Sequence, residues 1–416
     1  MTPEIKHRIE KIRRGNVPDG YKKTKAGILP ADWDVYMLGD CLSRVERPVE
    51  VRPNELYTQI GIRSHGKGLF YKEPVTGAAL GNKAVFWIEP DCFIVNIVFA
   101  WEQAIGKATQ SEVGMIGSHR FPMYRPVNDR VDIDYLISYF LTKRGTDILE
   151  AASPGGAGRN KTLGQDRFLK SKITLPPIEE QRKIAAILTT QDRVIELKEK
   201  RLAEKQRQKK YLMQQLLTGK KRLPGFSGEW SFPKAKDLFQ SVSDKDHNGD
   251  LAVLSSTQDR GIVPRVEVDI DIKYDACSLV NYKKVSKGNF VISLRSFQGG
   301  IEYSAYTGLV SPAYTVLSSR KEMSDGYYKQ FFKSTDYINR LNVAVYGIRD
   351  GKQISYEDFG RLQIPYPPIK EQDAIAEVLS TADREINLLQ QDIEQEKQKK
   401  KALMQLLLTG VVRVTI

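Results

Sequence analysis

Residues 176–219 have the sequence PPIEEQRKIAAILTTQDRVIELKEKRLAEKQRQKKYLMQQLLTG, and residues 367–410 have the sequence PPIKEQDAIAEVLSTADREINLLQQDIEQEKQKKKALMQLLLTG. The two stretches align without a gap at an offset of 191 residues (367 minus 176), and about half of the aligned positions are identical. The similarity extends weakly backwards, since Phe168 falls on Phe359. Self-similarity at one fixed separation indicates an internally duplicated chain.

Each repeated stretch is expected to form one long helix. Pro-Pro ends an extended segment, acidic residues follow in the first turn, and Gly219 or Gly410 supplies the stop. The length of about 40 residues corresponds to roughly 60 Å of helix. Apolar residues recur every three or four positions, which is typical of a coiled-coil seam. The expected seam consists of Ile184, Leu188, Ile195, Leu202, Leu212 and Leu216 in the first copy, and Ile375, Leu379, Ala382, Ile386, Leu389, Ile393, Leu403 and Leu407 in the second.

The seam becomes polar in its middle. Lys205 and Lys209 of the first copy align with Glu396 and Lys400 of the second. Such a break either fixes the register of the pair or is a solvated gap, and both interpretations stay open. A helix this long and thinly apolar needs a partner, and the simplest partner is the other copy, packed antiparallel about a pseudo-two-fold axis.

We therefore expect an α+β fold in which two pseudo-repeated mixed α/β domains alternate with two long helices that pair as an antiparallel coiled coil. The expected divisions are a basic N-terminal segment (1–30), a first domain (31–175), a first helix (176–220), a second domain (221–366), and a second helix with a C-terminal tail (367–416). Expected strands are Glu55–Ile62, Ala84–Ile88, Cys92–Trp101, Leu251–Ser255, Asn289–Ser293 and Ala313–Leu317, and expected helices are Ile133–Leu141 and Gly326–Lys333.

The net charge of +13 favours a polyanionic partner, but the charge is unevenly distributed. Residues 1–30 hold eight Lys/Arg against three acids, and residues 178–222 hold thirteen against six. Residues 31–177 and 223–368 each hold eighteen against seventeen, so the two domains are nearly neutral. This distribution argues against a purely non-specific clamp on a nucleic-acid backbone.

The three cysteines are far apart and form no CxxC pair, and the four histidines form no HExxH motif. This usage indicates a reducing compartment and predicts no metal site. The N-terminus lacks an apolar signal core, and the longest apolar run, around Phe93 to Trp101, is too short to span a bilayer. We therefore expect a soluble cytoplasmic protein without a membrane partner.

The frame of the chain resembles a known family. The PPIxEQ-x-x-IAxxL module that ends in LLTG, with a variable domain that opens with P-x-x-W before it, is similar to the specificity subunits of type I restriction–modification systems. The opening GYKKTKAGILPADWDVYMLGD is similar to the start of those subunits, and KRLPGFSGEW to their central junction. The resemblance covers essentially the whole chain, but for the variable domains only the flanking motifs match and not the sequence between them.

The resemblance implies a function as a DNA-binding, non-catalytic subunit. Each domain would be a target-recognition domain that reads half of a split site in double-stranded DNA. The helices would set the distance between the halves and dock two methyltransferase (modification) subunits, and restriction subunits would complete the nuclease. S-adenosylmethionine, ATP and Mg would bind to the partner subunits and none to this chain. The N-terminal segment and the tail Val411–Ile416 would lie near each other.

Loops with base-reading chemistry occur in both domains. The first domain offers a Gly-rich loop with Arg63, Ser64, His65 and Lys67, and a second group of Lys107 with Gln110. The second offers Arg295, Ser296 and Gln298 after an expected strand. Arg349 and Lys352 parallel Asn160 and Lys161, so a shared phosphate contact is one interpretation and a shared fold-closing turn the other. For the loop with Arg63, a plain surface turn is the alternative.

The same question arises where the helices start. Glu180, Gln181, Glu371 and Gln372 either dock a partner or cap the helices.

Catalytic motifs are missing. Each Pro-Pro is followed by Ile, so the (N/D)-P-P-(Y/F) motif of amino-methyltransferases is not present, and neither is a GxxxxGK(S/T) loop. Glu196-Leu197-Lys198 matches a nuclease Glu-x-Lys only by letters, since it is expected mid-helix on a solvated face. Two alternatives remain to the resemblance: a non-catalytic protein-binding scaffold, which the near-neutral domains favour, and a DNA-recognition subunit of a different defence effector.

Overall fold

The computed structural model describes residues 2–24, 27–155, 161–268, 276–294, 296, 300–344 and 354–414, without the side chains of 276–278 and 344. The chain forms two compact units. The first comprises Met1–Leu197 with Ile393–Ile416, and the second comprises Lys198–Asp392. Each unit contains one α/β domain and about half of each long helix, so the two units divide the chain differently from the five segments expected from the sequence.

The two long helices form where the repeat predicts them. Helix α6 spans Ile178–Leu216 and helix α12 spans Ile369–Leu407, each with 39 residues. Each begins directly after Pro-Pro and is followed by a glycine in the left-handed region, Gly219 (φ 72°) or Gly410 (φ 68°). Only glycine adopts that conformation without a steric cost, and this explains why each helix stops there.

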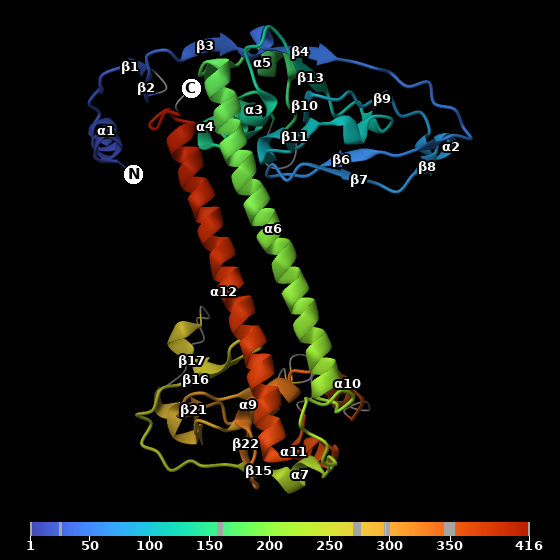
Figure 1. Cartoon of the computed structure of the whole chain (residues 1–416), viewed down its shortest axis with the longest axis vertical. Coiled ribbons are helices and arrows are strands. Elements are labelled where there is room, and N and C mark those ends of the chain that lie inside the picture. Colours follow the sequence, from blue (N-terminus) through green and yellow to red (C-terminus); the bar gives the residue numbers. More distant parts are fainter. Residues whose placement is uncertain are drawn as a thin grey trace. The chain divides into compact units, whose positions relative to one another are not determined.

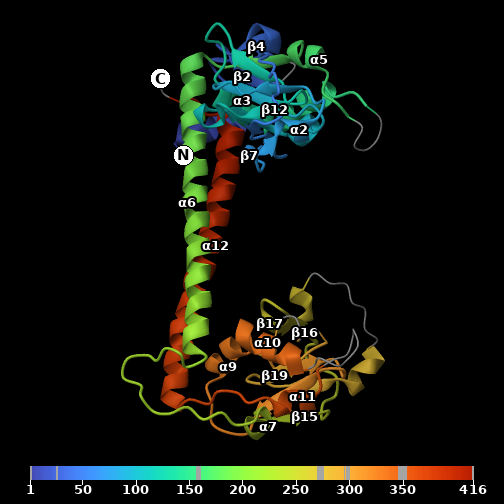
Figure 2. The same ribbon diagram turned by 90° about the vertical axis from the view of Figure 1, so that its right-hand side faces the viewer.

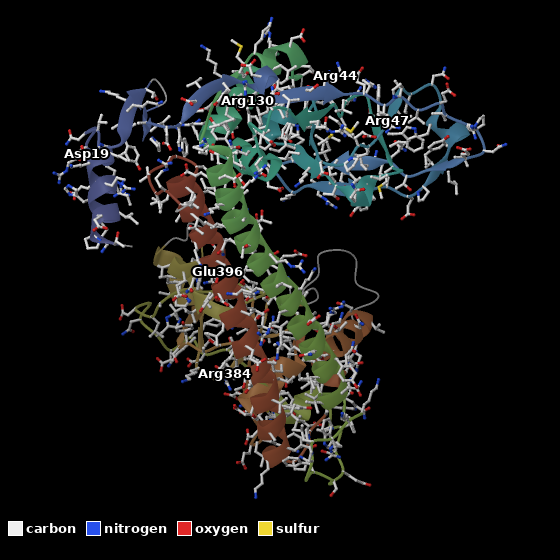
Figure 3. The ribbon with its side chains drawn as sticks, turned by 45° about the horizontal axis from the view of Figure 1, so that its top comes forward. Asp19, Arg44, Arg47, Arg130, Arg384 and Glu396 are labelled. Carbon is white, nitrogen blue, oxygen red and sulfur yellow. The ribbon has the colours of Figure 1, made fainter. Side chains whose placement is uncertain are left out.

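The helices lie side by side within the first unit (Figure 1, Figure 2). Ile184 and Leu188 of α6 share a hydrophobic core with Leu407 of α12. Further along, Gln191 Nε2 donates to Glu396 Oε2 at 2.7 Å; Glu396 is labelled in Figure 3. Residue numbers rise along α6 as they fall along α12, so this part of the pair is antiparallel.

The second unit contains the complementary part of the pair. Leu216 shares a core with Ile375 and Leu379. The polar middle of the seam is occupied by ion pairs: Lys205 lies 2.6 Å from Glu385, and Lys209 lies 2.6 Å from Asp383. The Lys209–Asp383 pair recurs at the equivalent positions in the first unit, where Lys400 lies 2.5 Å from Asp192. Because one ion pair recurs at equivalent positions in the two units, we favour the interpretation that the polar residues fix the register of the helix pair over that of a solvated gap.

The expected seam residues are buried or half-buried throughout. Ile184, Leu188, Ile375 and Leu379 are essentially inaccessible, whereas Leu197 and Leu388, which the seam excludes, are exposed. The seam members Ile195, Leu202, Leu212, Leu216, Ile386, Leu389, Ile393, Leu403 and Leu407 are all buried or half-buried.

The first domain is built on an antiparallel four-stranded sheet in the order β11-β10-β13-β4. These strands are β4 (Leu42–Val45), β10 (Cys92–Val95), β11 (Ile105–Ala108) and β13 (Met123–Pro126). Two-stranded pairs surround it: β1 (Tyr21–Thr24) with β2 (Gly27–Pro30), β3 (Asp34–Met37) with β14 (Lys172–Leu175), β5 (Leu56–Tyr57) with β8 (Val75–Thr76), β6 (Ile60–Ile62) with β7 (Leu69–Tyr71), and β9 (Val85–Trp87) with β12 (Ile116–Ser118). The helices are α1 (Pro3–Arg13), α2 (Gly77–Leu80), α3 (Ile133–Phe140), α4 (Lys143–Ala151) and α5 (Gln165–Leu169), with 3-10 turns η1 (Leu38–Asp40), η2 (Ala100–Glu102) and η3 (Gln110–Glu112).

The second domain repeats this sheet. Its antiparallel order is β15-β22-β19-β20. If the four strands of each sheet are numbered by their order in the chain, both sheets have the arrangement 1-4-2-3. The strands are β15 (Phe239–Val242), β19 (Phe290–Ile292), β20 (Glu302–Tyr303) and β22 (Thr315–Ser319), beside the pairs β16 (Leu254–Thr257) with β17 (Gly261–Pro264) and β18 (Lys283–Val285) with β21 (Gly308–Val310). The helices are α7 (Ala235–Leu238), α9 (Asp325–Phe331), α10 (Thr335–Ala344) and α11 (Tyr356–Arg361), with 3-10 turns η4 (Arg265–Glu267) and η5 (Ala276–Asn281).

The aromatic cores follow the duplication. Phe168 and Phe359, which align in the sequence, are both fully buried. Phe168 lies 5.8 Å from Phe140 between ring centroids in the first core, and Phe359 lies 5.9 Å from Phe239 in the second. The two domains thus share a scaffold although their loops differ.

One expected strand is shorter than predicted. The apolar run from Cys92 to Trp101 forms β10 only as far as Val95. The reason is Asn96, whose Oδ1 accepts a hydrogen bond from the backbone N–H of Val98 at 3.1 Å and turns the chain. The other expected strands and helices overlap observed ones, although Glu55–Ile62 is divided into β5 and β6.

The N-terminal segment and the C-terminal tail meet, as the resemblance implies. The hydroxyl of Tyr21 donates to the carbonyl oxygen of Gly410 at 2.8 Å. Val412 and Val414 pack against the first hydrophobic core. Among the described residues, no helix is both long enough and apolar enough to cross a membrane.

Candidate nucleic-acid interface

The first domain is fastened to its helix by a buried carboxylate. Glu180, in the first turn of α6, is 0% exposed. Its Oε2 accepts a hydrogen bond from Trp33 Nε1 at 3.2 Å. Arg413, beyond the end of α12, donates to both carboxylate oxygens of Glu180, at 2.6 and 2.8 Å. Arg413 also contacts Asp32 at 2.7 and 2.9 Å, and this contact lowers the pKa of Asp32.

The second domain has an equivalent arrangement, and we call each set of a buried Glu with its Trp and Arg partners a clasp. Glu371, in the first turn of α12, is also 0% exposed and accepts from Trp230 Nε1 at 2.9 Å. Arg222, beyond the end of α6, donates to both of its oxygens at 2.5 and 2.6 Å, and this contact raises the pKa of Arg222. Each arginine follows one helix and binds the glutamate that starts the other. Neither arginine was predicted from the sequence, although T-G-x-x-R occurs after each helix at the same offset of 191 residues.

The glutamine beside each glutamate connects the helix to a second element of the domain. Gln181 Oε1 accepts from the backbone N–H of Asp132, the residue that caps α3. Gln372 Oε1 accepts from the backbone N–H of Ser324, the residue before α9. All four Glu and Gln side chains are buried, and their hydrogen bonds connect the helix starts to the domains.

The Gly-rich loop of the first domain is largely held by its own contacts. Arg63 donates to the carbonyl oxygen of Leu69 at 2.8 Å and lies over the ring of Phe70. Ser64 donates to Glu102 at 2.9 Å. His65 and Lys67 are exposed, and His65 has a positive φ of 61°. The loop therefore presents Arg63, His65 and Lys67 to solvent, although Arg63 and Ser64 also have partners within the domain.

The other candidates of the first domain that the structure describes each have different surroundings. Lys107 is half-buried and forms an ion pair with Asp134 at 2.8 Å; burial lowers its pKa, but Asp134 more than compensates, so its pKa is raised overall. Gln110 is exposed in η3. Lys161 lies over the ring of Trp101 at 5.3 Å. Asn160 lies outside the described residues.

In the second domain, one candidate requires a correction. Ser296 was expected on a DNA-facing loop, but it is 1% exposed, and its Oγ accepts from the backbone N–H of Ser293 at 2.8 Å. Its hydroxyl therefore closes a turn inside the domain. The remaining candidates Arg295, Gln298, Arg349 and Lys352 lie outside the described residues.

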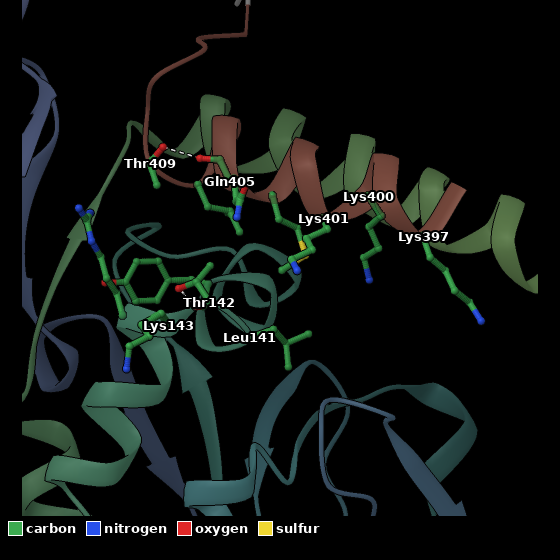
Figure 4. A pocket seen from close by; sticks show the side chains of 12 residues that line it. Leu141, Thr142, Lys143, Lys397, Lys400, Lys401, Gln405 and Thr409 are labelled. Atoms are coloured by element: carbon green, nitrogen blue, oxygen red, sulfur yellow. Dashed lines mark hydrogen bonds between the residues drawn. The ribbon is translucent and has the colours of Figure 1, made fainter. Parts of the chain in front are cut away.

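A basic pocket lies in the first unit between the α3–α4 turn and the last turns of α12 (Figure 4). Its volume is about 520 Å³. Lys143 lines the domain side and Lys400 and Lys401 line the helix side, around the apolar side chains of Leu141 and Met404. Lys400 and Lys143 are partly neutralised by Asp192 and Asp147. Cationic and apolar surface together suit a phosphate backbone or an acidic partner segment.

Comparison with known proteins identifies the class. Residues 88–207 and 227–398 each match the type I restriction modification DNA specificity domain, one match for each copy of the duplicated scaffold. The matches cover more than half of the chain, which therefore belongs to this family. The chain is similar to two proteins of Methanocaldococcus jannaschii, a putative type I restriction enzyme MjaX specificity subunit (25% identity, 95% of this chain and 97% of the relative) and the type I restriction enzyme MjaVIII specificity subunit (24%, 95% and 96%).

Solved structures share the fold. A chain from a type I R-M system, described for its complex assembly and conformational transition, superposes with a TM-score of 0.57 at 19% identity, over 92% of this chain and 99% of that one. The S subunit of a type I restriction–modification system from M. genitalium gives a TM-score of 0.55 at 12% identity, over 92% and 96%. The HsdS subunit from Thermoanaerobacter tengcongensis gives 0.50 at 19%, over 92% and 98%.

Proposed function

We propose that this chain is the sequence-specific DNA-binding specificity subunit of a type I restriction–modification complex and reads a bipartite DNA target. The observation that carries the proposal is the duplicated scaffold: two domains with the same strand order, each matching the DNA specificity domain, but with different loops. One scaffold with two sets of loops suits the recognition of two different half-sites, since base contacts come from loop side chains and the frame needs only to position them.

The two long helices pair, in this proposal, as an antiparallel coiled coil. The support is the alternation of buried seam residues with exposed ones such as Leu197 and Leu388, together with the repeated Lys–Asp pair near each end. The number of residues in the helices sets the spacing between half-sites, as the spacing between subunits does in dimeric DNA-binding proteins.

Catalysis belongs to partner subunits. The chain carries neither an amino-methyltransferase motif nor a GxxxxGK(S/T) loop. Among the described residues, no group of three or more His, Cys, Asp or Glu side chains is placed to hold a metal ion. In the proposed complex, two methyltransferase subunits and the restriction subunits dock on this chain, and S-adenosylmethionine, ATP and Mg bind to those subunits. The exposed faces of α6 and α12 are the proposed docking surfaces.

The test is co-expression of this chain with the methyltransferase encoded beside it, followed by genome-wide mapping of modified bases. The expected result is one split motif, methylated in both halves and lost when this chain is omitted. A stable, active complex that methylates no split motif would overturn the proposal and favour a protein-binding scaffold or a subunit of another effector.

A further inference from the structure

A second basic cleft lies entirely within the first domain. Its volume is about 370 Å³, and it is formed where the ends of several short strands meet. Lys72 follows β7, Lys83 precedes β9, and His119 and Arg120 follow β12. Gln59, Asn96 and Ser118 complete the polar lining. We call these seven residues the Lys72 cleft. None of the loops expected from the sequence contributes to it.

The charge of the Lys72 cleft is uncompensated. No acidic residue lines it. In the described part of the chain, no carboxylate lies within ion-pair distance of Lys72, Lys83 or Arg120. Other basic residues of the domain do have such partners: Arg47 and Arg125 both contact Glu89. In a domain that is nearly neutral overall, unpaired cations gathered in one hollow create a local attraction for anions.

Two carboxamides lie in the same hollow. Asn96 is 8% exposed, and its Oδ1 is fixed by the backbone N–H of Val98, which holds the side chain in one orientation. Its Nδ2 and the amide of Gln59 make no side-chain hydrogen bond to any residue that the structure describes. Donors and acceptors of this kind, held on a rigid frame, are suited to the edge of a nucleic-acid base.

We propose that the Lys72 cleft is the surface with which the first domain reads its half of the DNA target. This inference rests on the proposed function and identifies the residues that perform it. Lys72 and Lys83 contact backbone phosphates, while Arg120 and Gln59 contact base edges. The cleft is too small for a whole duplex, so it receives one stretch of backbone and the base edge beside it. The Gly-rich loop around Arg63 differs from the cleft, because the Arg63 guanidinium already has contacts within the domain, with Leu69 and Phe70.

The experiment uses the complex of the full chain with its methyltransferase subunits. Arg120→Ala and Gln59→Ala should relax the methylated motif at one or two base pairs of a single half-site. The expected loss of discrimination is roughly 5- to 150-fold at each position, as for a bidentate base contact. Lys72→Ala and Lys83→Ala should weaken binding to all sequences and lower the slope of log K against log salt by about 1 each. All four residues are at least partly exposed, so the variants should fold.

Arg52→Ala is the matched control, because Arg52 is an exposed arginine of the same domain that pairs with Glu55 outside the cleft. It should change neither the motif nor the salt slope. If the wild-type complex methylates a split motif but the cleft variants change nothing, the cleft assignment is overturned and the proposed function stands. If the variants fail to assemble with the methyltransferase, the cleft is a protein-docking surface and the assignment also fails. If the wild-type complex has no split motif, both proposals are overturned together.

Discussion

Arg413 and Glu180 are separated by 233 residues in the chain, yet the guanidinium contacts both oxygens of the buried carboxylate. The contact connects the tail that follows α12 to the start of α6. Its counterpart, between Arg222 and Glu371, connects the segment after α6 to the start of α12. The duplicated halves are therefore interlocked, because each supplies the arginine that the other requires.

Removal of Arg413 should destabilise the first unit strongly. Arg413→Ala leaves the Glu180 carboxylate buried with only Trp33 as a side-chain donor, and breaking a buried pair typically costs about 3–5 kcal/mol. Because Arg413 itself is partly exposed, we expect about 2–3 kcal/mol. The measurement is chemical denaturation followed by tryptophan fluorescence. Arg14→Ala, which breaks an exposed pair with Glu10, is the control and should cost less than about 1 kcal/mol. Equal effects of the two substitutions would contradict the clasp.

The clasp should also make stability depend on pH. Arg413 lowers the pKa of Asp32 from its usual value of 3.8. A carboxyl whose pKa is lowered by folding adds stability above its unfolded pKa, and this stability is lost as the pH falls through the folded pKa. The difference in unfolding free energy between wild type and Asp32→Asn should therefore be largest above about pH 4 and shrink below it. Denaturation midpoints measured between pH 3 and pH 6 test this, and a constant difference would exclude it.

Gly410 should tolerate alanine less well than its equivalent Gly219. Both have a positive φ, which costs a residue with a side chain about 1 kcal/mol. A Cβ at Gly410 would also lie 2.5 Å from Pro30 and 3.1 Å from Trp33, whereas at Gly219 the nearest atoms are those of Trp230 at 3.2 Å. Overpacking of this kind lowers the free energy of unfolding by about 1–3 kcal/mol more. The melting temperature of Gly410→Ala should therefore be lower than that of Gly219→Ala, and the reverse order would contradict the prediction.

The length of the helices should govern half-site spacing. Deletion of Ile195–Arg201 from α6 alone shifts one helix against the other by seven residues, so the proposed coiled coil loses its register and assembly should fail or the spacing should shift. The matched variant also deletes residues 386–392, the equivalent heptad of α12. It keeps the seam in phase and should assemble with a changed spacing in the methylated motif. If either shortened chain methylated the wild-type motif with unchanged spacing, the hypothesis that helix length sets the half-site spacing would be wrong.

The loop of the second domain can be tested in the same assay. Arg295→Ala with Gln298→Ala should relax one half-site only, since Arg and Gln are base-reading side chains on a Gly-rich loop. Ser296→Ala is a useful comparison, because Ser296 is buried and should affect stability more than specificity. Unchanged specificity at both halves would remove this loop from the interface.

The long helices could be predicted because their signals are local. Pro-Pro, the apolar period and the terminal glycine all lie within one stretch, and α6 and α12 start and end where these signals do. The strand order β4-β13-β10-β11 could not be predicted, since it joins segments far apart in the chain. Within β10, the apolar run concealed the turn that Asn96 imposes, because periodicity does not register a single side-chain hydrogen bond.

The candidate site shows the same division. Residue type suggested Ser296, but in the folded domain this side chain is buried and bound to Ser293, which its sequence does not indicate. Lys72 and Lys83 have no distinctive sequence context, and only folding brings them together around one hollow. The short motif that ends in Arg222 and Arg413 was present in both copies, but a buried ion pair between distant segments leaves no local signal of its importance.

The interlocking of the halves has a consequence for how the chain folds during its synthesis. The second unit is one continuous segment, so all of it is synthesised before α12 is complete. The core of the first unit includes Leu407, Leu408 and Val412, which are made more than 200 residues after Leu197, the last residue of that unit's first segment. Since the ribosome adds about 5–20 residues per second, the first domain lacks these apolar core residues for many seconds after its own synthesis. The first unit can therefore complete its core only after the whole second unit has been synthesised.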